Sequence, residues 1–247
     1  MQSPITPPTG LVHAGQLTVA ADLAYPPQEY VDRSGQPVGS DIDLARAIAA
    51  QMRLKLKVVN INVDGIVPGF ASNDHRYDMG ISAQPETKTL DASAKTVPYF
   101  VSGEAILIPT ANPDHVHGID DLCGLKVGAN RASSGEVAVQ LENERPCQDK
   151  PIKYNAYDND VDGVKDLRAG KLDAYVEDYP VTVYFARSYH GLRVVPHQFA
   201  TSTDVMVFPI NDTTVSSAVA QAFERLRRDG TYRRILRTWG LEEGALT

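Results

Sequence analysis

Polar side chains follow two similar stretches of the chain, and they are its first candidates for binding chemistry. VDGI at 63–66 leads to the strand-like segment RYDMGIS, which ends on Ser82, and VDGV at 161–164 leads to KLDAYVED, which ends on Asp178. Open α/β sheets bind ligands beyond the carboxyl ends of their strands. The repeat therefore predicts two similar lobes, with Ser82 and Asp178 as candidate contacts in one shared site between them.

A third polar group stands at the start of a predicted helix. The run LKVGANRASSGE, which begins at Leu125, predicts a strand, a loop and a helix whose amino end carries Ser133 and Ser134. The unpaired N–H groups of a helix amino end can hold a carboxylate or another acceptor. The alternative is that a serine only caps the helix. Both interpretations hold if one serine caps while its neighbour binds.

The elements that must position these residues alternate between strands and helices. Residues 17–20 and 56–59 are β-prone runs. Between them, Asp41 or Asp43 can cap a helix that continues through Met52, with apolar residues at helical spacing. Strands separated by helices imply a parallel sheet with helices on both faces. The predicted fold class is therefore α/β.

Three further segments complete the predicted architecture. A strand that begins at Glu104 is the predicted first crossing between the lobes, and residues 205–210 form the predicted return strand. Residues 215–240 predict an amphipathic helix that is interrupted by Asp-Gly at 229–230. Its many arginines are intermixed with acidic residues, which is typical of solvated helix faces rather than of a site for an anionic partner.

Composition bounds the class of protein. The 247 residues are enough for one or two domains, and 43% hydrophobic with 22% charged residues are ordinary globular values. The formal net charge of −7 argues against a nucleic-acid partner, because phosphate binding relies on clustered cations. The sequence predicts no membrane span. Residues 1–15 lack the features of an intact signal peptide and are predicted to form a tether.

The two cysteines, Cys123 and Cys147, lie within one predicted lobe. No CxxC motif or His partner is near them to indicate metal or redox chemistry. A disulfide is the favoured interpretation, and two free buried thiols are the alternative. An unstrained disulfide closing a loop of this size would contribute on the order of 3 kcal/mol. It would also place the protein outside the reducing cytosol.

Catalytic and metal-binding constellations are weak in this sequence. Glu177 beside Asp178 is a possible acid pair, but adjacent strand residues point to opposite faces. His115 and His117 would share one strand face, but no third ligand is evident nearby, so exposed polar histidines are favoured. ASSG lacks the GxSxG elbow, and no His has an evident Ser or Cys partner. We therefore predict no enzyme activity, no metal site and no cofactor.

Six segments, taken in order, resemble the extracytoplasmic solute-binding proteins of amino-acid-type ABC importers, the polar amino acid binding family 3. They run from about residue 15 to residue 240 and are YPPQEYVDRSGQPVGSDIDLARAIA, VDGIVPGF, YDMGIS, DDLCGLKVGANRASSGE, GKLDAYVEDYPV and RRDGTYRRILRTWG. The two cysteines fall where a subset of such proteins has a DLCG…C pair. The resemblance implies the type II periplasmic binding protein fold, in which two Rossmann-like lobes joined by two crossing strands close on a small ligand. The expected boundaries are 16–108 plus 204–247 for lobe 1 and 109–203 for lobe 2.

The resemblance also implies six ligand-binding positions, which are Tyr25, Gln28, Ser82, Ser133, Ser134 and Asp178. Tyr25 matches the aromatic residue that walls the ligand, and Asp178 matches the acid that receives an α-ammonium. Ser82 matches a hydroxyl or backbone contact of the first lobe. The two adjacent serines match paired hydroxyls that hold a carboxylate. Gln28 stands where the family usually has Phe, which is expected to make the mouth of the site more polar.

One departure from the family concerns the carboxylate of the ligand. The family places an Arg in a TxxR or PER-type segment after the first-lobe strand, where its planar fork clamps the α-carboxylate. In this chain Thr87 or Leu90 takes that position. Lys88, Arg33 or Arg131 are candidate replacements, although surface charge is the favoured role of each. A standard α-amino acid therefore loses its main support as the ligand.

The expected function is that of a monomeric binding protein outside the cytoplasm, in the periplasm or as a membrane-anchored lipoprotein. It would capture a small polar amino-acid-like or amine solute and deliver it to an ABC importer permease. Asp178, Tyr25 and the acidic balance of the chain favour a cationic or zwitterionic solute. A ligand-sensing receptor module of the same fold is the first alternative, and a dehydratase-type enzyme is a less favoured one.

Overall fold

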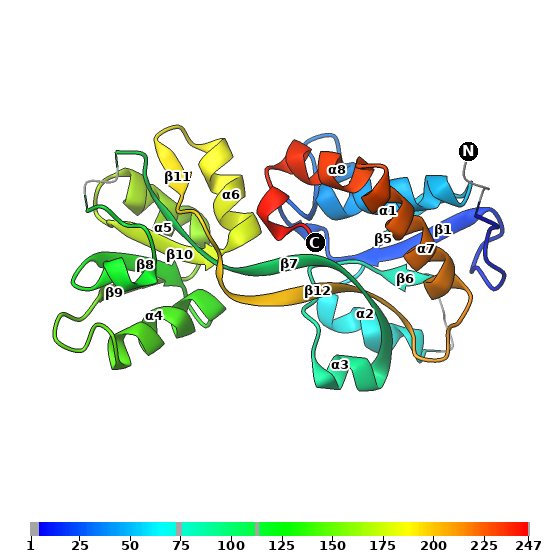
Figure 1. Ribbon diagram of the computed structural model, residues 1–247, viewed down its shortest axis with the longest axis horizontal. Coiled ribbons are helices and arrows are strands. Elements are labelled where there is room, and N and C mark those ends of the chain that lie inside the picture. The colour runs from blue at the N-terminus through cyan, green and yellow to red at the C-terminus, as the bar shows by residue number, and fades with distance from the viewer. Residues whose placement is uncertain (1–4, 73–75, 112–113, 247) are drawn as a thin grey trace. The chain divides into compact units, whose positions relative to one another are not determined.

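The computed structural model describes residues 5–72, 76–111 and 114–246, and the chain divides into two compact units (Figure 1). Unit 1 takes in residues 1–101 and 202–247, and unit 2 takes in residues 102–201. The divisions fall inside strand β7 (Ala94–Pro109) and strand β12 (Phe199–Pro209). Unit 2 is therefore one continuous stretch of chain, whereas unit 1 is built from two.

Unit 1 is built on a mixed sheet with the strand order β5, β1, β6 and β12. Strand β1 pairs in parallel with β5 and β6, and β12 runs antiparallel to β6. A second, three-stranded sheet is antiparallel. The strands of unit 1 besides β7 and β12 are β1 (Gln16–Ala21), β2 (Ala24–Tyr25), β3 (Glu29–Val31), β4 (Pro37–Val38), β5 (Lys55–Asn60) and β6 (Met79–Gly80).

The helices of unit 1 are α1 (Ser40–Gln51), α2 (Val63–Phe70), α3 (Lys88–Ser93), α7 (Val215–Arg228) and α8 (Thr231–Trp239), with a 3-10 turn at Glu242–Gly244. The predicted interruption near the C-terminus is confirmed, because α7 ends at Arg228 and Gly230 adopts a left-handed φ of 78° before α8. The predicted cap of α1 is wrong. Gly39 holds the cap position without a side-chain hydrogen bond, while Asp41 and Asp43 lie in the first turn.

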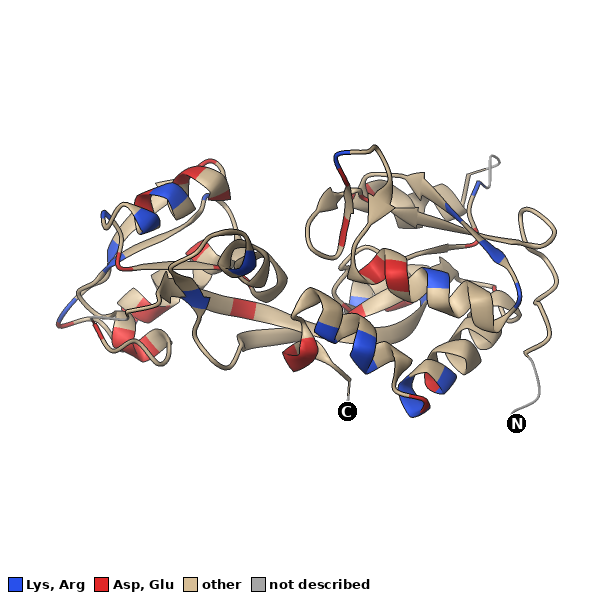
Figure 2. Ribbon diagram, turned by 90° about the horizontal axis from the view of Figure 1, so that it is seen from above, with Lys and Arg blue, Asp and Glu red and all other residues tan. Residues whose placement is uncertain are grey.

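The arginine-rich C-terminal helices carry their charges outside an apolar stripe. Phe223 and Leu226 of α7 are buried, and the guanidinium of Arg227 pairs with Glu224 of the same helix. Lys and Arg are interspersed with Asp and Glu along the ribbon (Figure 2). The prediction of solvated helix faces for this segment agrees with that distribution.

Unit 2 contains the strands β7, β10, β8 and β9 of the nine-stranded sheet, in that order, with β11 on β7. Strand β8 pairs in parallel with β9 and β10, whereas β10 and β11 are antiparallel to β7. Its strands besides β7 are β8 (Lys126–Asn130), β9 (Lys153–Tyr157), β10 (Ala174–Asp178) and β11 (Leu192–Val194). Its helices are α4 (Ser134–Glu144), α5 (Asp160–Arg168) and α6 (Tyr179–Ser188), with a 3-10 turn at Ile119–Leu122.

The predicted disulfide is confirmed. The sulfurs of Cys123 and Cys147 are bonded at 2.04 Å, and both residues belong to unit 2. The bond joins the end of the 3-10 turn to the segment that follows α4. Cys147 is buried in a core cluster that also contains Leu122, Val127 and Val139, so the cross-link lies against the apolar centre of the unit.

The internal repeat is visible in matching hydrogen bonds at two strand starts. Asp78 donates its backbone N–H to the carbonyl of Thr18 at 2.8 Å, and its carboxylate accepts the N–H of Thr18 at 2.7 Å. Asp173 makes the same two bonds with Lys126, both at 2.8 Å. Each Asp therefore fixes the start of its strand, β6 or β10, against the parallel strand beside it.

The helices of the repeat also begin in the same way. The side chain of Asn62 caps α2 by accepting the N–H of Asp64, and the side chain of Asn159 caps α5 by accepting the N–H of Asp162. Capping by Asn satisfies N–H groups that the first helical turn leaves without partners. The VDG motif is therefore the first turn of a helix in both units.

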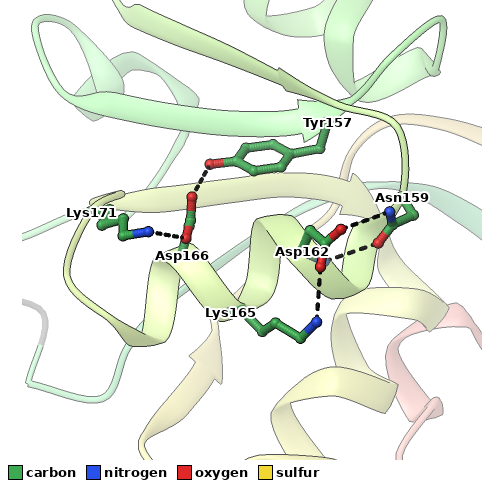
Figure 3. A network of polar contacts seen from close by, with 6 residues as sticks. All are labelled: Tyr157, Asn159, Asp162, Lys165, Asp166 and Lys171. Carbon is green, nitrogen blue, oxygen red and sulfur yellow. Dashed lines mark hydrogen bonds and ion pairs between the residues drawn. The ribbon is translucent and has the colours of Figure 1, made fainter.

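Surface polar contacts fasten α5 to its neighbours (Figure 3). Asp166 of α5 accepts the hydroxyl of Tyr157 from β9 at 3.1 Å and the ammonium of Lys171 at 2.9 Å. One turn earlier, Asp162 pairs with Lys165 at 2.8 Å. These contacts orient the helix that precedes β10, whose carboxyl end carries Asp178.

The N-terminal segment, predicted as a tether, is held on unit 1 over its described residues 5–15. Ile5 is 5% exposed, the carbonyl of Thr9 accepts the hydroxyl of Thr214, and the N–H of Val12 donates to the Asp78 carboxylate at 2.7 Å. Residues 1–4 lie outside the described residues.

Candidate functional site

Ser82, the polar residue after β6, uses its hydroxyl within unit 1. The hydroxyl accepts the backbone N–H of Asp22 at 3.0 Å and donates to the Glu29 carboxyl at 2.9 Å. Ser82 is 4% exposed, so this hydroxyl lies in the interior of the unit. Its contribution to ligand binding would therefore come through the backbone of this turn, one of the two roles that the sequence predicted.

The Ser82 hydroxyl contacts a buried pair of acids, Glu29 and Asp41, that was not predicted from the sequence. Glu29 and Asp41 are 1% and 2% exposed. Burial raises the pKa of Glu29 well above its usual value, and the Asp41 carboxylate raises it further. Asp41 accepts a hydrogen bond from the Tyr99 hydroxyl, which in turn accepts the N–H of Ala83 at 3.2 Å. The pair therefore anchors the turn that contains Ser82.

Tyr25 and Gln28 stand on either side of the Pro26–Pro27 segment, whose peptide bond is cis. Tyr25 is half-buried on β2. Gln28 is 1% exposed, and neither its side-chain oxygen nor its side-chain nitrogen has a hydrogen-bond partner among the described residues. The amide is thus an interior group of unit 1.

Of the two residues that can match the missing arginine, Leu90 is part of the unit 1 core and Thr87 is exposed. Leu90 is 8% exposed and belongs to a cluster with Ile66 and Val207. Thr87 caps α3, because its hydroxyl accepts the N–H of Leu90 at 3.1 Å. Of the candidate replacement cations, Arg131 pairs with Asp158 at 2.9 Å, and its side chain is 61% exposed. Lys88 and Arg33 are also exposed.

In unit 2 the two serines divide their roles. Ser133 is the N-cap of α4: its hydroxyl accepts the N–H of Glu136 at 3.1 Å and donates to the carbonyl of Asn130 at 2.7 Å. Ser134 is the first helical residue, is exposed, and hydrogen-bonds to the carboxyl of Glu104. Capping by one serine, which was an open alternative, is therefore the role of the Ser133 hydroxyl.

Asp178 ends β10 and occupies the cap position of α6 without a capping side-chain hydrogen bond. It is half-buried, and it lies directly opposite Glu104 in the antiparallel pairing of β10 with β7. The Asp178 carboxyl is close enough to raise the pKa of Glu104. Capping of α6 therefore does not account for this side chain.

Glu104 and Asp178 therefore meet at the carboxyl end of β10, and Glu177, which precedes Asp178 on the strand, has Asp160 and Asp178 as its acidic neighbours. Burial raises the pKa of Glu104 to about 7, and Asp178 adds to the increase while the Ser134 hydroxyl opposes it. Burial, with Asp160 and Asp178 beside it, raises the pKa of Glu177 to about 9. The cause in both cases is that a charged carboxylate is poorly solvated in the interior and repelled by like charges. This end of the strand would be stabilised by a cationic group.

Glu104 is the residue of this group that sequence reasoning missed as a site residue. Its signal is slight, since it is an acid at the start of an apolar run on the predicted crossing strand. Its partner Asp178 lies far away in the sequence, and only the strand register brings the two together.

Other features of the described residues offer no comparable chemistry. The possible metal ligands that cluster there are Cys123, Glu142 and Cys147, whose two sulfurs are bonded to each other. A pocket of about 350 Å³ in unit 2 is lined by Arg168, His190 and their neighbours and includes none of the predicted ligand-binding positions. No helix among the described residues has the length and apolar character of a membrane span.

Comparison with known proteins gives the family. Residues 17–242 match the bacterial extracellular solute-binding proteins, family 3. The arginine-binding protein ArgT of Corynebacterium glutamicum is 27% identical over 243 residues, which cover 97% of this chain and 79% of that protein. The ABC transporter arginine-binding protein 1 of Escherichia coli K12 is 25% identical over 237 residues, which cover 93% of each chain.

Solved structures agree with this assignment. An ancestral cationic amino acid solute-binding protein has a TM-score of 0.79 and 27% identity, with 91% of this chain and 95% of that chain covered. A structure described as an ancestral amino acid-binding protein and precursor of cyclohexadienyl dehydratase has a TM-score of 0.65 and 26% identity, with the same coverage. The fold is the type II periplasmic binding protein fold that was predicted. The chain belongs to the bacterial extracellular solute-binding proteins of family 3.

Proposed function

We propose that this protein captures a cationic amino-acid-like or amine solute outside the cytoplasm and delivers it to the permease of an ABC importer. The observation that supports a cationic solute best is the pair of carboxyls at the end of β10, where Asp178 lies opposite Glu104. Relatives named as arginine-binding proteins support the same class of solute. The disulfide supports a location outside the reducing cytosol.

We take the two units as the lobes of the binding protein, and each carries proposed contacts of its own. Tyr25, the unpartnered amide of Gln28 and the backbone after Ser82 are the proposed contacts of unit 1. In unit 2, Asp178 is proposed to accept the cationic nitrogen, and Ser134 is proposed to offer its exposed hydroxyl at the start of α4. Ser133 would act indirectly, by capping the helix that presents Ser134.

We propose binding without turnover. A dehydratase-type activity is the second candidate, because a carboxyl such as Glu104 with a pKa of about 7 is suited to general acid catalysis and one structural neighbour is described as a dehydratase precursor. Recovery of unchanged solute after prolonged incubation supports binding alone. Conversion of the solute would contradict it.

The transport role also has a competing interpretation, because a ligand-sensing receptor can use the same fold. The proposal takes the protein as a monomer, periplasmic or anchored as a lipoprotein, that docks on its permease. Reconstitution with the permease and ATPase of the same operon should give ATP-dependent uptake of the solute. Binding to those components without uptake would favour the sensing role.

A screen followed by mutation of Asp178 tests the proposed ligand class. Amino acids, amines, betaines and opine-like compounds should be screened by thermal shift, because a specific ligand stabilises the folded state by mass action. Asp178→Asn and Asp178→Ala should then lower affinity for a cationic hit by roughly 2–5 kcal/mol, which is tens- to thousands-fold. Calorimetry measures the loss.

The controls separate binding from stability. Asp158→Asn, which removes an exposed surface carboxylate of the same unit, should leave affinity unchanged. Unfolding midpoints of all variants show whether the fold is intact. Wild-type affinity in both Asp178 variants would refute its role as the receptor of the cation.

A further inference from the structure

Glu104 is aimed at the same place as the proposed cation receptor. It faces Asp178 across the β7–β10 pairing, and the hydroxyl of Ser134 reaches it from the amino end of α4. Glu104 is 3% exposed, and its Oε2 atom has no hydrogen-bond partner among the described residues. A buried carboxyl oxygen without a partner costs free energy, so a ligand donor at this position would stabilise the site.

The backbone of α4 comes close to the Glu104 Oε2 atom at Gly135. A Cβ at position 135 would lie 3.2 Å from the Glu104 Oε2 atom and 2.8 Å from the carbonyl oxygen of Val176. Only a glycine avoids both close contacts, so Gly135 lets the first turn of α4 approach the carboxyl. The amino end of the 11-residue helix α4 therefore lies beside the Glu104 carboxyl.

We propose that Glu104 is a second specificity-determining residue of the ligand site, which acts beside Asp178 so that unit 2 offers two carboxyl groups to one guanidinium or ammonium. The proposal rests on the proposed function and extends it. A nitrogen cation with several N–H donors can satisfy both carboxyls at once, and a guanidinium does so with a fixed planar fork. A ligand with a single neutral donor would leave one carboxyl without its partner.

Ligand binding should then be linked to proton release. The pKa of Glu104 is raised to about 7 by burial and by Asp178 of β10, the titratable group that faces it, while Ser134 of α4 contributes only a hydroxyl. Glu177 lies on the same strand as Asp178, and its acidic neighbours are Asp160 and Asp178. A bound cation favours the charged form of Glu104, so binding expels the proton that the free protein holds below about pH 7.

The magnitude of the linkage follows from the titration of one group. With a pKa of about 7, roughly a tenth of the Glu104 carboxyls are ionised at pH 6 and roughly nine-tenths at pH 8. Affinity for a cation that requires the ionised form should therefore rise about tenfold over this range. Arginine and agmatine are suitable probes because a guanidinium keeps its charge throughout.

Calorimetry with L-arginine, L-lysine, agmatine and putrescine at pH 6 and pH 8 tests the inference. The wild-type protein should bind at least one probe about tenfold more tightly at pH 8. It should also release up to one proton per ligand at pH 6, seen as a difference between buffers of unlike ionisation enthalpy. Glu104→Gln should bind at least tenfold more weakly at pH 8 and lose both the pH dependence and the proton release.

Two controls keep the outcomes distinct. Glu144→Gln, an exposed change at the end of α4, should behave as wild type. Proton release by the wild-type protein needs no variant, so it remains decisive if Glu104→Gln fails to fold. A wild type that binds a probe without proton release, or a folded Glu104→Gln with unchanged affinity, overturns this inference and leaves the proposed function standing. A wild type that binds none of the four cations overturns both.

Discussion

Replacing Glu177 by Gln should stabilise the protein at neutral pH. Glu177 is 7% exposed, and burial beside Asp160 and Asp178 raises its pKa from the ordinary 4.5 to about 9. Between these values the folded protein holds a proton that the unfolded chain has released. The stability of the fold therefore falls as pH rises through this window, and the contribution is complete only below about pH 4.5.

The size of the effect follows from the distance between the ordinary pKa and the working pH. At pH 7 that distance is about 2.5 pH units, and each unit corresponds to about 1.4 kcal/mol, so retaining the proton costs roughly 3 kcal/mol. At pH 5 the same calculation gives under about 1 kcal/mol. Gln has the shape of the protonated acid, and its oxygen can still accept the N–H of Asp178, which Glu177 accepts at 3.2 Å.

Urea denaturation at pH 5, 6, 7 and 8, followed by circular dichroism, measures the difference. Glu177→Gln should be more stable than wild type by roughly 3 kcal/mol at pH 7, and the advantage should shrink toward pH 5. Glu144→Gln is the matched control, because this exposed acid lies in the same unit. Parallel pH profiles for wild type and Glu177→Gln would mean that Glu177 is ionised in the folded protein and would refute the reasoning.

Two further predictions concern the covalent and backbone framework. Thiol titration of the denatured, unreduced protein should find no free thiol, and two reactive thiols would contradict the disulfide. Replacing Cys123 and Cys147 together by Ser should lower the free energy of unfolding by about 3 kcal/mol, measured by denaturant titration. Asp78→Asn and Asp173→Asn each weaken the hydrogen bonds at one strand start, so each should lower the free energy of unfolding by about 1–3 kcal/mol. Asp78→Asn should cost more, because the Asp78 carboxylate also accepts the N–H of Val12. Unchanged stability in both variants would show that these bonds do not hold the strands.

Much of the fold could be predicted because its signals are local. The VDG motifs mark helix starts, and the apolar runs after Asp78 and Asp173 mark strands, since each depends on residues that are close in the sequence. The two lobes followed from comparing these local patterns. The disulfide could be predicted from cysteine number and surroundings, without knowledge of distant contacts.

The failures involve side chains whose partners are distant. Asp41 has the residue type of a helix cap, but it lies in the first turn of α1 and accepts the Tyr99 hydroxyl instead. Because Asp41 is 2% exposed, its carboxyl depends on a hydrogen-bond donor from the interior, which the sequence around α1 does not reveal. Ser82 likewise turns inward to Glu29.

The candidate site could be predicted only in part for the same reason. Asp178 and Ser134 were found from strand and helix ends, which the sequence marks locally. Glu104 depends on the register between β7 and β10, and the division of work between the two serines depends on rotamers. Neither the strand register nor the side-chain rotamers can be predicted from residue spacing. The ligand-binding roles of the six predicted positions remain predictions that the Asp178 and Glu104 experiments address.

The burial of Leu90 has an evolutionary consequence. If Leu90 is the position that matches the carboxylate-clamping arginine expected from the family resemblance, a guanidinium there would lie among Ile66, Val205 and Val207 and would lose its hydration without gaining a partner. The alternative match, Thr87, is exposed, so an arginine there would cost only the hydroxyl that caps α3. A return of the clamp by one substitution is therefore open at the surface of α3 and closed in the core beneath it.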